Sequence, residues 1–180
     1  LKLIGYSTNM TAQSFHTTHH NKIEVYDSES DLIAYDIDKG EVTNLENDAN
    51  ELEVFPAWAP DGKTLYYCSA HFEWKDSALT KVDEIIKRSQ EIKYNIYRNR
   101  FNPETMAFGP RELVFSADSL NKSATLPRIS PDGRYLMFAL AECGVFHCWH
   151  HDADIWMLDL SSAAARPMTE INSPDTESYH

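Results

Sequence analysis

Histidine and cysteine are concentrated in three short segments of this 180-residue chain. Seven of its eight histidines fall within residues 8–25, 70–93 and 141–154. Imidazole and thiolate groups are ligands for zinc, copper, nickel and iron, so these segments are candidates for a metal site. A transition metal such as zinc is the cofactor that such a cluster would hold. The candidate ligands are His16, His19, His20, Cys143, His147, Cys148, His150 and His151.

The same residues allow two other interpretations. Cys143 and Cys148 are close enough in sequence to form a small disulfide loop in an oxidising compartment. Histidines in exposed loops, in contrast, need no partner at all. The sequence contains no Cys-x-x-Cys-His motif, so covalent attachment of a c-type haem is not supported. A metal site, a disulfide and incidental surface residues therefore all remain open.

Large aromatic residues lie in two of the same segments. Such side chains either pack an insertion against the fold or serve as anchors for a binding partner. Motifs for catalysis are weak in comparison, because no serine lies in a Gly-x-Ser-x-Gly sequence and there is no glycine-rich phosphate loop. The sequence thus favours binding over catalysis. The candidate partner-binding residues are Phe72, Trp74, Phe146 and Trp149.

The composition limits the class of partner. The chain carries 16 Lys and Arg against 28 Asp and Glu, for a formal net charge of -12. Phosphate groups would repel such a chain, so we expect neither nucleic acid nor an anionic membrane surface as a partner. No apolar run approaches the roughly 18 residues that a membrane-spanning helix needs. A protein is the partner that we expect.

The strands that must position these segments belong to a sequence pattern that occurs twice. "FPAWAPDGKTLYYCS" (55–69) and "LPRISPDGRYLMFAL" (126–140) share Pro-Asp-Gly and the spacing of the apolar residues around it. Proline presets the backbone of a turn, aspartate can accept hydrogen bonds from the backbone, and glycine adopts the left-handed conformation that follows. Each segment is therefore predicted to be a tight antiparallel hairpin.

A second pair of strands recurs three times, in residues 30–45, 93–115 and 153–169, and the last two copies follow the Pro-Asp-Gly hairpins. Four antiparallel strands per repeat form the blade of a β-propeller. We therefore expect an all-β fold: about three four-stranded antiparallel blades, part of a six- to eight-bladed ring, with one helical insert. The predicted boundaries are 1–54 for a blade lacking its inner strand, 55–125, 126–170, and 171–180 for the start of a further blade.

The three segments described above, residues 8–25, 70–93 and 141–154, are inserts, and each joins the second strand of a blade to the third. All three are therefore expected at one end of the propeller, opposite the Pro-Asp-Gly turns. The middle insert is predicted to hold a helix over about 76–92, capped by Asp76 or Ser77. Unpaired strands at the open blade edges would allow edge-to-edge self-association.

The Pro-Asp-Gly repeats resemble those of the TolB-like, or WD40-like (PD40), β-propeller family. The resemblance implies a non-catalytic propeller module that binds or scaffolds a protein in the periplasm or cell envelope of a Gram-negative bacterium. The same blade occurs beside peptidase domains and in some polysaccharide lyases, so both remain alternatives, as does a metal- or haem-associated propeller. Fold alone does not choose between these functions.

Overall fold

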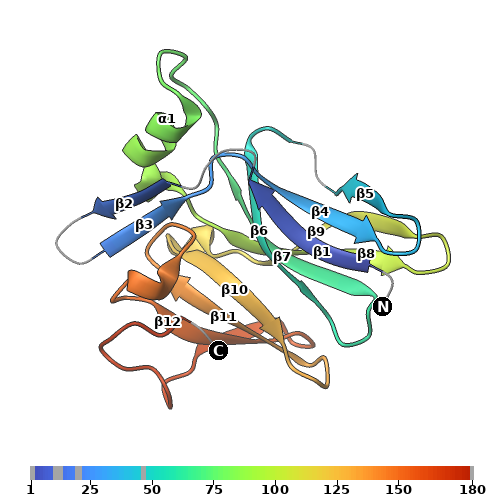
Figure 1. The fold of residues 1–180 in the computed structure, drawn as a ribbon. Coiled ribbons are helices and arrows are strands. Elements are labelled where there is room, and N and C mark those ends of the chain that lie inside the picture. The colour runs from blue at the N-terminus through green and yellow to red at the C-terminus, as the bar shows by residue number, and fades with distance from the viewer. Residues whose placement is uncertain (1–2, 10–13, 19–21, 46–47, 179–180) are drawn as a thin grey trace.

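A computed structural model describes residues 3–9, 14–18, 22–45 and 48–178; the side chains of residues 8–26 and 149 are not described. Within these ranges the chain is a segment of a β-propeller (Figure 1), with three antiparallel sheets and a separate two-stranded hairpin. No helix in the described ranges has the length and apolar character needed to cross a membrane.

The three sheets are successive blades. The first contains β1 (Leu3–Asn9), β4 (Ser30–Asp36) and β5 (Glu41–Asn44) in that order, so β1 is its inner edge. The second contains β6 (Glu51–Trp58), β7 (Thr64–His71), β8 (Asn95–Asn102) and β9 (Ala107–Phe115). The third contains β10 (Ser123–Ile129), β11 (Tyr135–Ala141), β12 (Asp154–Asp159) and β13 (Ala164–Pro167).

The inner strands of the second and third blades begin before the predicted boundaries at residues 55 and 126. Both strands continue across a β-bulge, where the pairing register shifts after Val54 and after Thr125. The residue at each bulge, Phe55 or Leu126, has a φ of 55° and directly precedes a proline. A bulge inserts an extra residue without ending the strand, so the pairing resumes upstream of it.

The Pro-Asp-Gly hairpins form as predicted. Gly62 and Gly133 have φ values of 66° and 73°, in the left-handed region that glycine enters at little cost. Asp61 Oδ1 accepts a hydrogen bond from the Lys63 amide at 2.8 Å, and Asp132 Oδ1 accepts one from Arg134 at 3.1 Å. We call the end of the segment that carries these hairpins the turn end.

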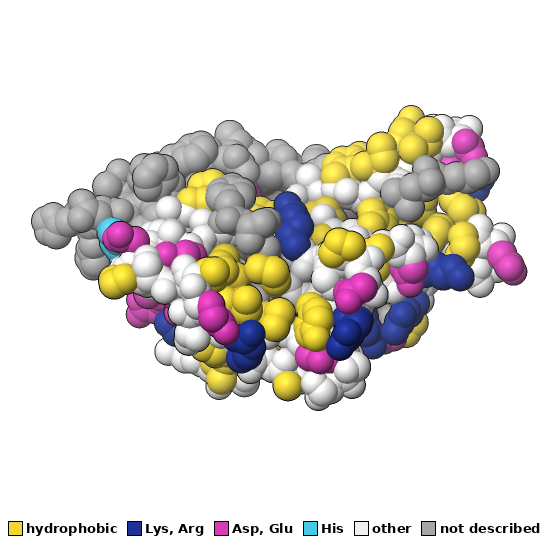
Figure 2. Space-filling model, turned by 90° about the horizontal axis from the view of Figure 1, so that it is seen from below, with side chains coloured by type: hydrophobic (Ala, Val, Ile, Leu, Met, Phe, Trp, Pro, Cys, Tyr) yellow, Lys and Arg dark blue, Asp and Glu magenta, His cyan; other side chains and the backbone are white. Residues whose placement is uncertain are grey.

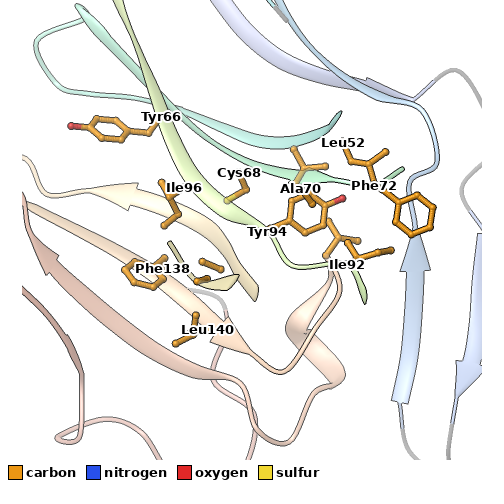
Figure 3. Packing of buried hydrophobic residues seen from close by; sticks show 14 of the residues in the cluster. Leu52, Tyr66, Cys68, Ala70, Phe72, Ile92, Tyr94, Ile96, Phe138 and Leu140 are labelled. Atoms are coloured by element: carbon orange, nitrogen blue, oxygen red, sulfur yellow. The ribbon is translucent and has the colours of Figure 1, made fainter. Parts of the chain in front are cut away.

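The hydrophobic core lies between the blades. Alternate residues of β7 point to opposite sides, so that Tyr66 and Cys68 pack toward the third blade while Leu65 and Tyr67 pack toward the first. The side chains between the second and third blades form the larger cluster (Figure 3). A strand buried on both faces holds its neighbours in place, which makes the second blade the centre of the described fold.

The inserts differ from their predicted form in two respects. The first insert contains the hairpin β2 (Ser14–Thr18) and β3 (Lys22–Tyr26), a pair of strands for which no prediction was made. The helix of the second insert begins later than predicted: α1 spans Lys81–Lys87, followed by the 3-10 turn η2 (Ser89–Glu91). Two further 3-10 turns are η3 (Asp118–Leu120) and η4 (His147–Trp149).

The late start of α1 has a local cause. Thr80, rather than Asp76 or Ser77, caps the helix, since its Oγ1 accepts a hydrogen bond from the Asp83 amide at 3.1 Å. The amides of Lys75 and Asp76 donate instead to the carboxylate of Glu84, at 2.8 and 3.2 Å. These hydrogen bonds keep the residues before Thr80 in a loop that folds back on the helix.

Candidate functional site

The inserts of all three blades gather at one end of the segment. β3 of the first insert lies against both α1 of the second and η4 of the third. The turns that join β6 to β7 and β10 to β11 lie at the other end, as Figure 1 shows. We call the end formed by residues 14–18, 22–26, 72–92 and 142–153 the insert face. The prediction that the inserts share one end is confirmed.

An open pocket of about 360 Å³ lies on the insert face, between the first blade, the first strand of the second blade and α1. Its lining is strongly acidic, with four carboxylates and one lysine, and we call it the acidic pocket. Lys81 pairs with one of the carboxylates, Glu29, at 2.8 Å. The lining residues are Ser28, Glu29, Asp31, Asp48, Ala49, Glu51 and Lys81.

The remaining carboxylates of the pocket differ in how they are compensated. Glu51 is paired with Arg111 at 2.9 Å and accepts a hydrogen bond from Ser69 at 2.6 Å. Asp48 Oδ1 accepts a hydrogen bond from the backbone amide of Asn50. In the described part of the chain, neither Asp48 nor Asp31 has a cationic partner. The pocket therefore holds uncompensated negative charge on two neighbouring segments of the chain.

The wall of the pocket formed by the second insert is held rigidly. The Arg88 guanidinium donates to Glu84 at 2.6 Å and lies 4.5 Å from the centre of the Phe72 ring. The amide of Lys75, followed by that of Asp76 and by Arg88, holds the pKa of Glu84 below its usual range. A buried carboxylate that accepts several hydrogen bonds fixes the loop and the helix in one arrangement.

Two of the aromatic residues proposed as partner anchors pack within this insert. Phe72 is 2% exposed and lies in the core cluster, so its ring offers no face to a partner. Trp74 is half-buried, lies edge-on to Phe72 at 4.8 Å, and donates from Nε1 to the Ala49 carbonyl at 3.0 Å. Phe146 is also half-buried and packs against the same cluster, whereas the Trp149 side chain lies outside the described residues.

The histidines of the third insert are buried. His147 is fully buried, with Nδ1 2.9 Å from Thr125 Oγ1 and Nε2 3.1 Å from the Gly144 carbonyl oxygen. A carbonyl only accepts, so Nε2 carries the proton and donates it, and Nδ1 accepts from the Thr125 hydroxyl. Burial, followed by the neighbouring His150, lowers the pKa of His147 to about 3. Both ring nitrogens of a neutral His147 are thus used inside the protein.

The other candidate ligands do not assemble around it. His150 is fully buried beside His147 at 5.3 Å between ring centres, whereas His151 is exposed. Cys143 is buried, and its Sγ lies 3.3 Å from Gln90 Oε1. Cys148 is half-buried. All three cysteines are described, and no disulfide joins them. Among the described residues no three His, Cys, Asp or Glu side chains are placed to hold a metal.

The first insert contributes the remaining candidate ligands. His16 lies in β2 opposite Glu24, but its side chain is outside the described set, and His19 and His20 lie outside the described residues altogether.

The acidic pocket was missed because its carboxylates lie outside the predicted inserts: Glu29 and Asp31 at the start of β4, and Asp48 and Glu51 at the start of the second blade. A signal was nevertheless present in the sequence. Asp31, Asn95 and Asp154 each directly precede the first apolar residue of the third strand of a blade. In the second blade, Asn95 Oδ1 accepts the Asp118 amide of the following connection. This recurring position therefore marks where the connections between blades pass.

Comparison with known structures gives the fold a family likeness. A putative TolB from Agrobacterium tumefaciens superposes over 92% of this chain with a TM-score of 0.54 and 18% identity. Puromycin hydrolase superposes over 93% with a TM-score of 0.52 and 14% identity. TolB from Acinetobacter baumannii matches 78% of the chain at 23% identity, with a TM-score of 0.46. No protein-family model and no curated protein sequence matches the chain.

These likenesses establish the fold and nothing finer. The chain covers 44% of the length of the Agrobacterium protein and 21% of that of puromycin hydrolase. It therefore spans less than half of the structures that it resembles. Since its propeller neighbours include a hydrolase, function has to be argued from the site itself.

Proposed function

We propose that this stretch of TolB-like propeller belongs to a non-catalytic module that binds a basic segment of a protein partner at its insert face. The observation that carries this proposal is the acidic pocket, where Asp31 and Asp48 lack a cationic partner among the described residues. A lysine or arginine side chain entering the pocket would supply the missing positive charge. Complementary charge of this kind steers association and fixes which partner is accepted.

The geometry of the pocket supports a protein partner over a small ligand. The pocket is open and lies beside the half-buried Trp74 ring, which Lys81 covers at 5.3 Å. Aromatic side chains are enriched in protein interfaces relative to the rest of the surface. The wall around it is rigid, because Glu84 and Arg88 fix the insert, so less conformational entropy would be lost on binding.

The test uses a fluorescein-labelled hexapeptide of alternating lysine and leucine, with a glutamate–leucine peptide as its charge control. We expect saturable binding of the lysine peptide to the intact protein, measured by fluorescence anisotropy and weakened by salt. The double variant Asp31→Asn, Asp48→Asn should weaken it about tenfold, or about 1.4 kcal/mol. Asparagine is conservative at position 31, since Asn95 stands at the matching place in the second blade.

The matched control removes two carboxylates at the turn end, in the variant Glu41→Gln, Glu104→Gln. Both residues are exposed and lie at hairpins away from the pocket. Equal loss of affinity in the two double variants would show that only net charge matters, and would contradict the proposal. Turnover of peptides or oligosaccharides by the intact protein, abolished by changes on the insert face, would contradict the non-catalytic role.

The proposed compartment is the periplasm or cell envelope, and it rests on the TolB-like fold. Release of the intact protein from cells by osmotic shock, with a cytoplasmic marker retained, is the expected result. The metal-bound alternative finds no support among the described residues.

A further inference from the structure

A second site lies at the turn end, between the second and third blades. A polar cleft of about 550 Å³ opens there, within the size range of small-molecule sites. We call it the inter-blade cleft. The second blade contributes Thr64, Tyr66, Arg98 and Arg100, and the third contributes Ile129 and Leu160. The two Pro-Asp-Gly turns form its ends.

The repeat provides an internal reference for this cleft, because the first and second blades meet in the same way. At that interface a pocket of only about 70 Å³ is lined by residues of the first blade and by Met106 and Phe108. Trp58 and Phe101 of the second blade pack against Phe108, with their own rings 5.6 Å apart and at 74°. The corresponding residues of the third blade are Ile129 and Leu160. Replacing two large rings by aliphatic side chains leaves the second interface open.

The other wall of the cleft, which the second blade forms, also differs from its counterpart in the first blade. Counted from the matching strand residues Leu32 and Ile96, the positions of Arg98 and Arg100 correspond to Ala34 and Asp36 in the first blade. The wider space is therefore the one that carries two guanidinium groups. Neither change is needed to build a blade, since the first interface forms without them.

The two arginines are engaged to different extents. Arg98 pairs with Glu112, with Nε 2.8 Å from Oε2. Arg100 donates from Nη1 to Thr64 Oγ1 at 3.2 Å and forms no ion pair with any residue that the structure describes. Thr64 is 2% exposed, so this hydrogen bond anchors the guanidinium to the floor of the cleft.

Two aspartates also line the cleft, but their carboxylates serve their own turns. Asp61 Oδ1 accepts the Lys63 amide at 2.8 Å. Asp132 Oδ1 accepts the Ser130 hydroxyl at 2.6 Å and the Arg134 amide at 3.1 Å. Each carboxylate is thus held in its hairpin, while the Arg100 guanidinium retains donors that none of these bonds uses.

We propose that the inter-blade cleft binds a small organic anion, a carboxylate or phosphate group carried on an apolar body. The planar guanidinium of Arg100 matches either anionic group through paired hydrogen bonds, with Arg98 adding positive charge. Ile129 and Leu160 form the apolar wall against which the body of the ligand packs. This site is separate from the acidic pocket, which selects the opposite charge at the opposite end of the segment.

The test uses benzoate and phenyl phosphate as probes, with benzyl alcohol as the uncharged control, in saturation-transfer NMR on the intact protein. We expect signals for the two anions and none for the alcohol. Arg100→Gln should weaken anion binding at least tenfold, whereas Arg166→Gln, an exposed arginine on β13, should leave it unchanged. The tighter of the two anions identifies the preferred head group.

A second variant tests the shape of the site without removing charge. Ile129→Trp restores the residue that closes the matching interface, and it should abolish binding while the protein stays folded. Absence of anion binding to the natural protein would overturn the proposal. Undiminished binding in either Arg100→Gln or Ile129→Trp, or equal binding of benzyl alcohol, would also overturn it.

Discussion

His147 Nδ1 lies 2.9 Å from the hydroxyl oxygen of Thr125, so the third insert is tied to the inner strand β10 of its own blade. The imidazole is fully buried and its other nitrogen faces the Gly144 carbonyl. A histidine selected from the sequence as a metal ligand is therefore a structural link between an insert and the blade that carries it.

The first prediction concerns pH. Because the pKa of His147 falls from 6.5 to about 3 on folding, the unfolded chain binds a proton that the folded chain does not, over that range. Stability contributed by this residue is complete above pH 6.5 and falls as the pH drops toward 3. At pH 5 the expected loss is about 2 kcal/mol. Urea denaturation at pH 7 and pH 5 measures it.

The matched variants are His147→Gln and His71→Gln. Glutamine at 147 does not titrate, so the part of the acid destabilisation due to this residue should disappear, although the variant is less stable overall. His71 is an exposed histidine, with 62% of its side chain accessible, and its replacement should leave the pH dependence intact. A pH profile unchanged by His147→Gln would show that another group is responsible.

The second prediction concerns Phe72. Truncating this buried ring to alanine should cost about 3–5 kcal/mol, because it opens a cavity in the core and removes the ring that Arg88 covers. Leu113→Ala, at a side chain that is 56% exposed, should cost less than about 1 kcal/mol. Equal costs in urea denaturation would mean that Phe72 does not pack as described.

The third prediction concerns Glu84. In Glu84→Gln, we expect faster hydrogen exchange at the amides of Lys75 and Asp76, since a neutral amide accepts these hydrogen bonds less strongly. The low pKa of Glu84 implies a stability contribution present above the unfolded value and lost as the pH falls through the folded value. The control Glu73→Gln alters an exposed carboxylate of the same insert and should not change the exchange.

The fourth prediction concerns thiol reactivity. Burial raises the pKa of the Cys68 thiol far above its usual range, and Cys143 is also buried, whereas Cys148 is half-buried. Iodoacetamide should therefore modify Cys148 first in the folded protein, as peptide mass spectrometry can show, and all three cysteines only after denaturation. Recovery of a Cys143–Cys148 disulfide from the natural protein would contradict this arrangement.

The fifth prediction separates backbone strain from packing. An alanine Cβ at position 133 would meet no atom within 4 Å, but the φ of 73° is left-handed, so Gly133→Ala should cost about 1–2 kcal/mol through strain alone. Gly109 has no left-handed φ, and an added Cβ would lie 3.5 Å from the Arg100 carbonyl, an ordinary contact. Gly109→Ala should therefore change stability by less than about 0.5 kcal/mol.

Several features of the fold could be predicted because they depend on short stretches of sequence. The hairpins at Gly62 and Gly133 follow from proline, aspartate and glycine in adjacent positions. The order of strands follows from repetition of the same pattern, and with it the placement of all inserts at one end. The start of α1 was harder to predict, since Glu84, a residue within the helix, holds the amides of Lys75 and Asp76 outside it.

What the sequence determined by itself was the blade, because turn chemistry and alternating apolar residues act over a few residues at a time. What only the tertiary structure decided was the fate of the side chains that meet between blades. His147 became a buried link, Asp31 and Asp48 came together beside Lys81, and Ile129 left open a space that Trp58 fills in the other interface. These outcomes depend on which sheet faces contact each other, and the packing of whole sheets determines those contacts.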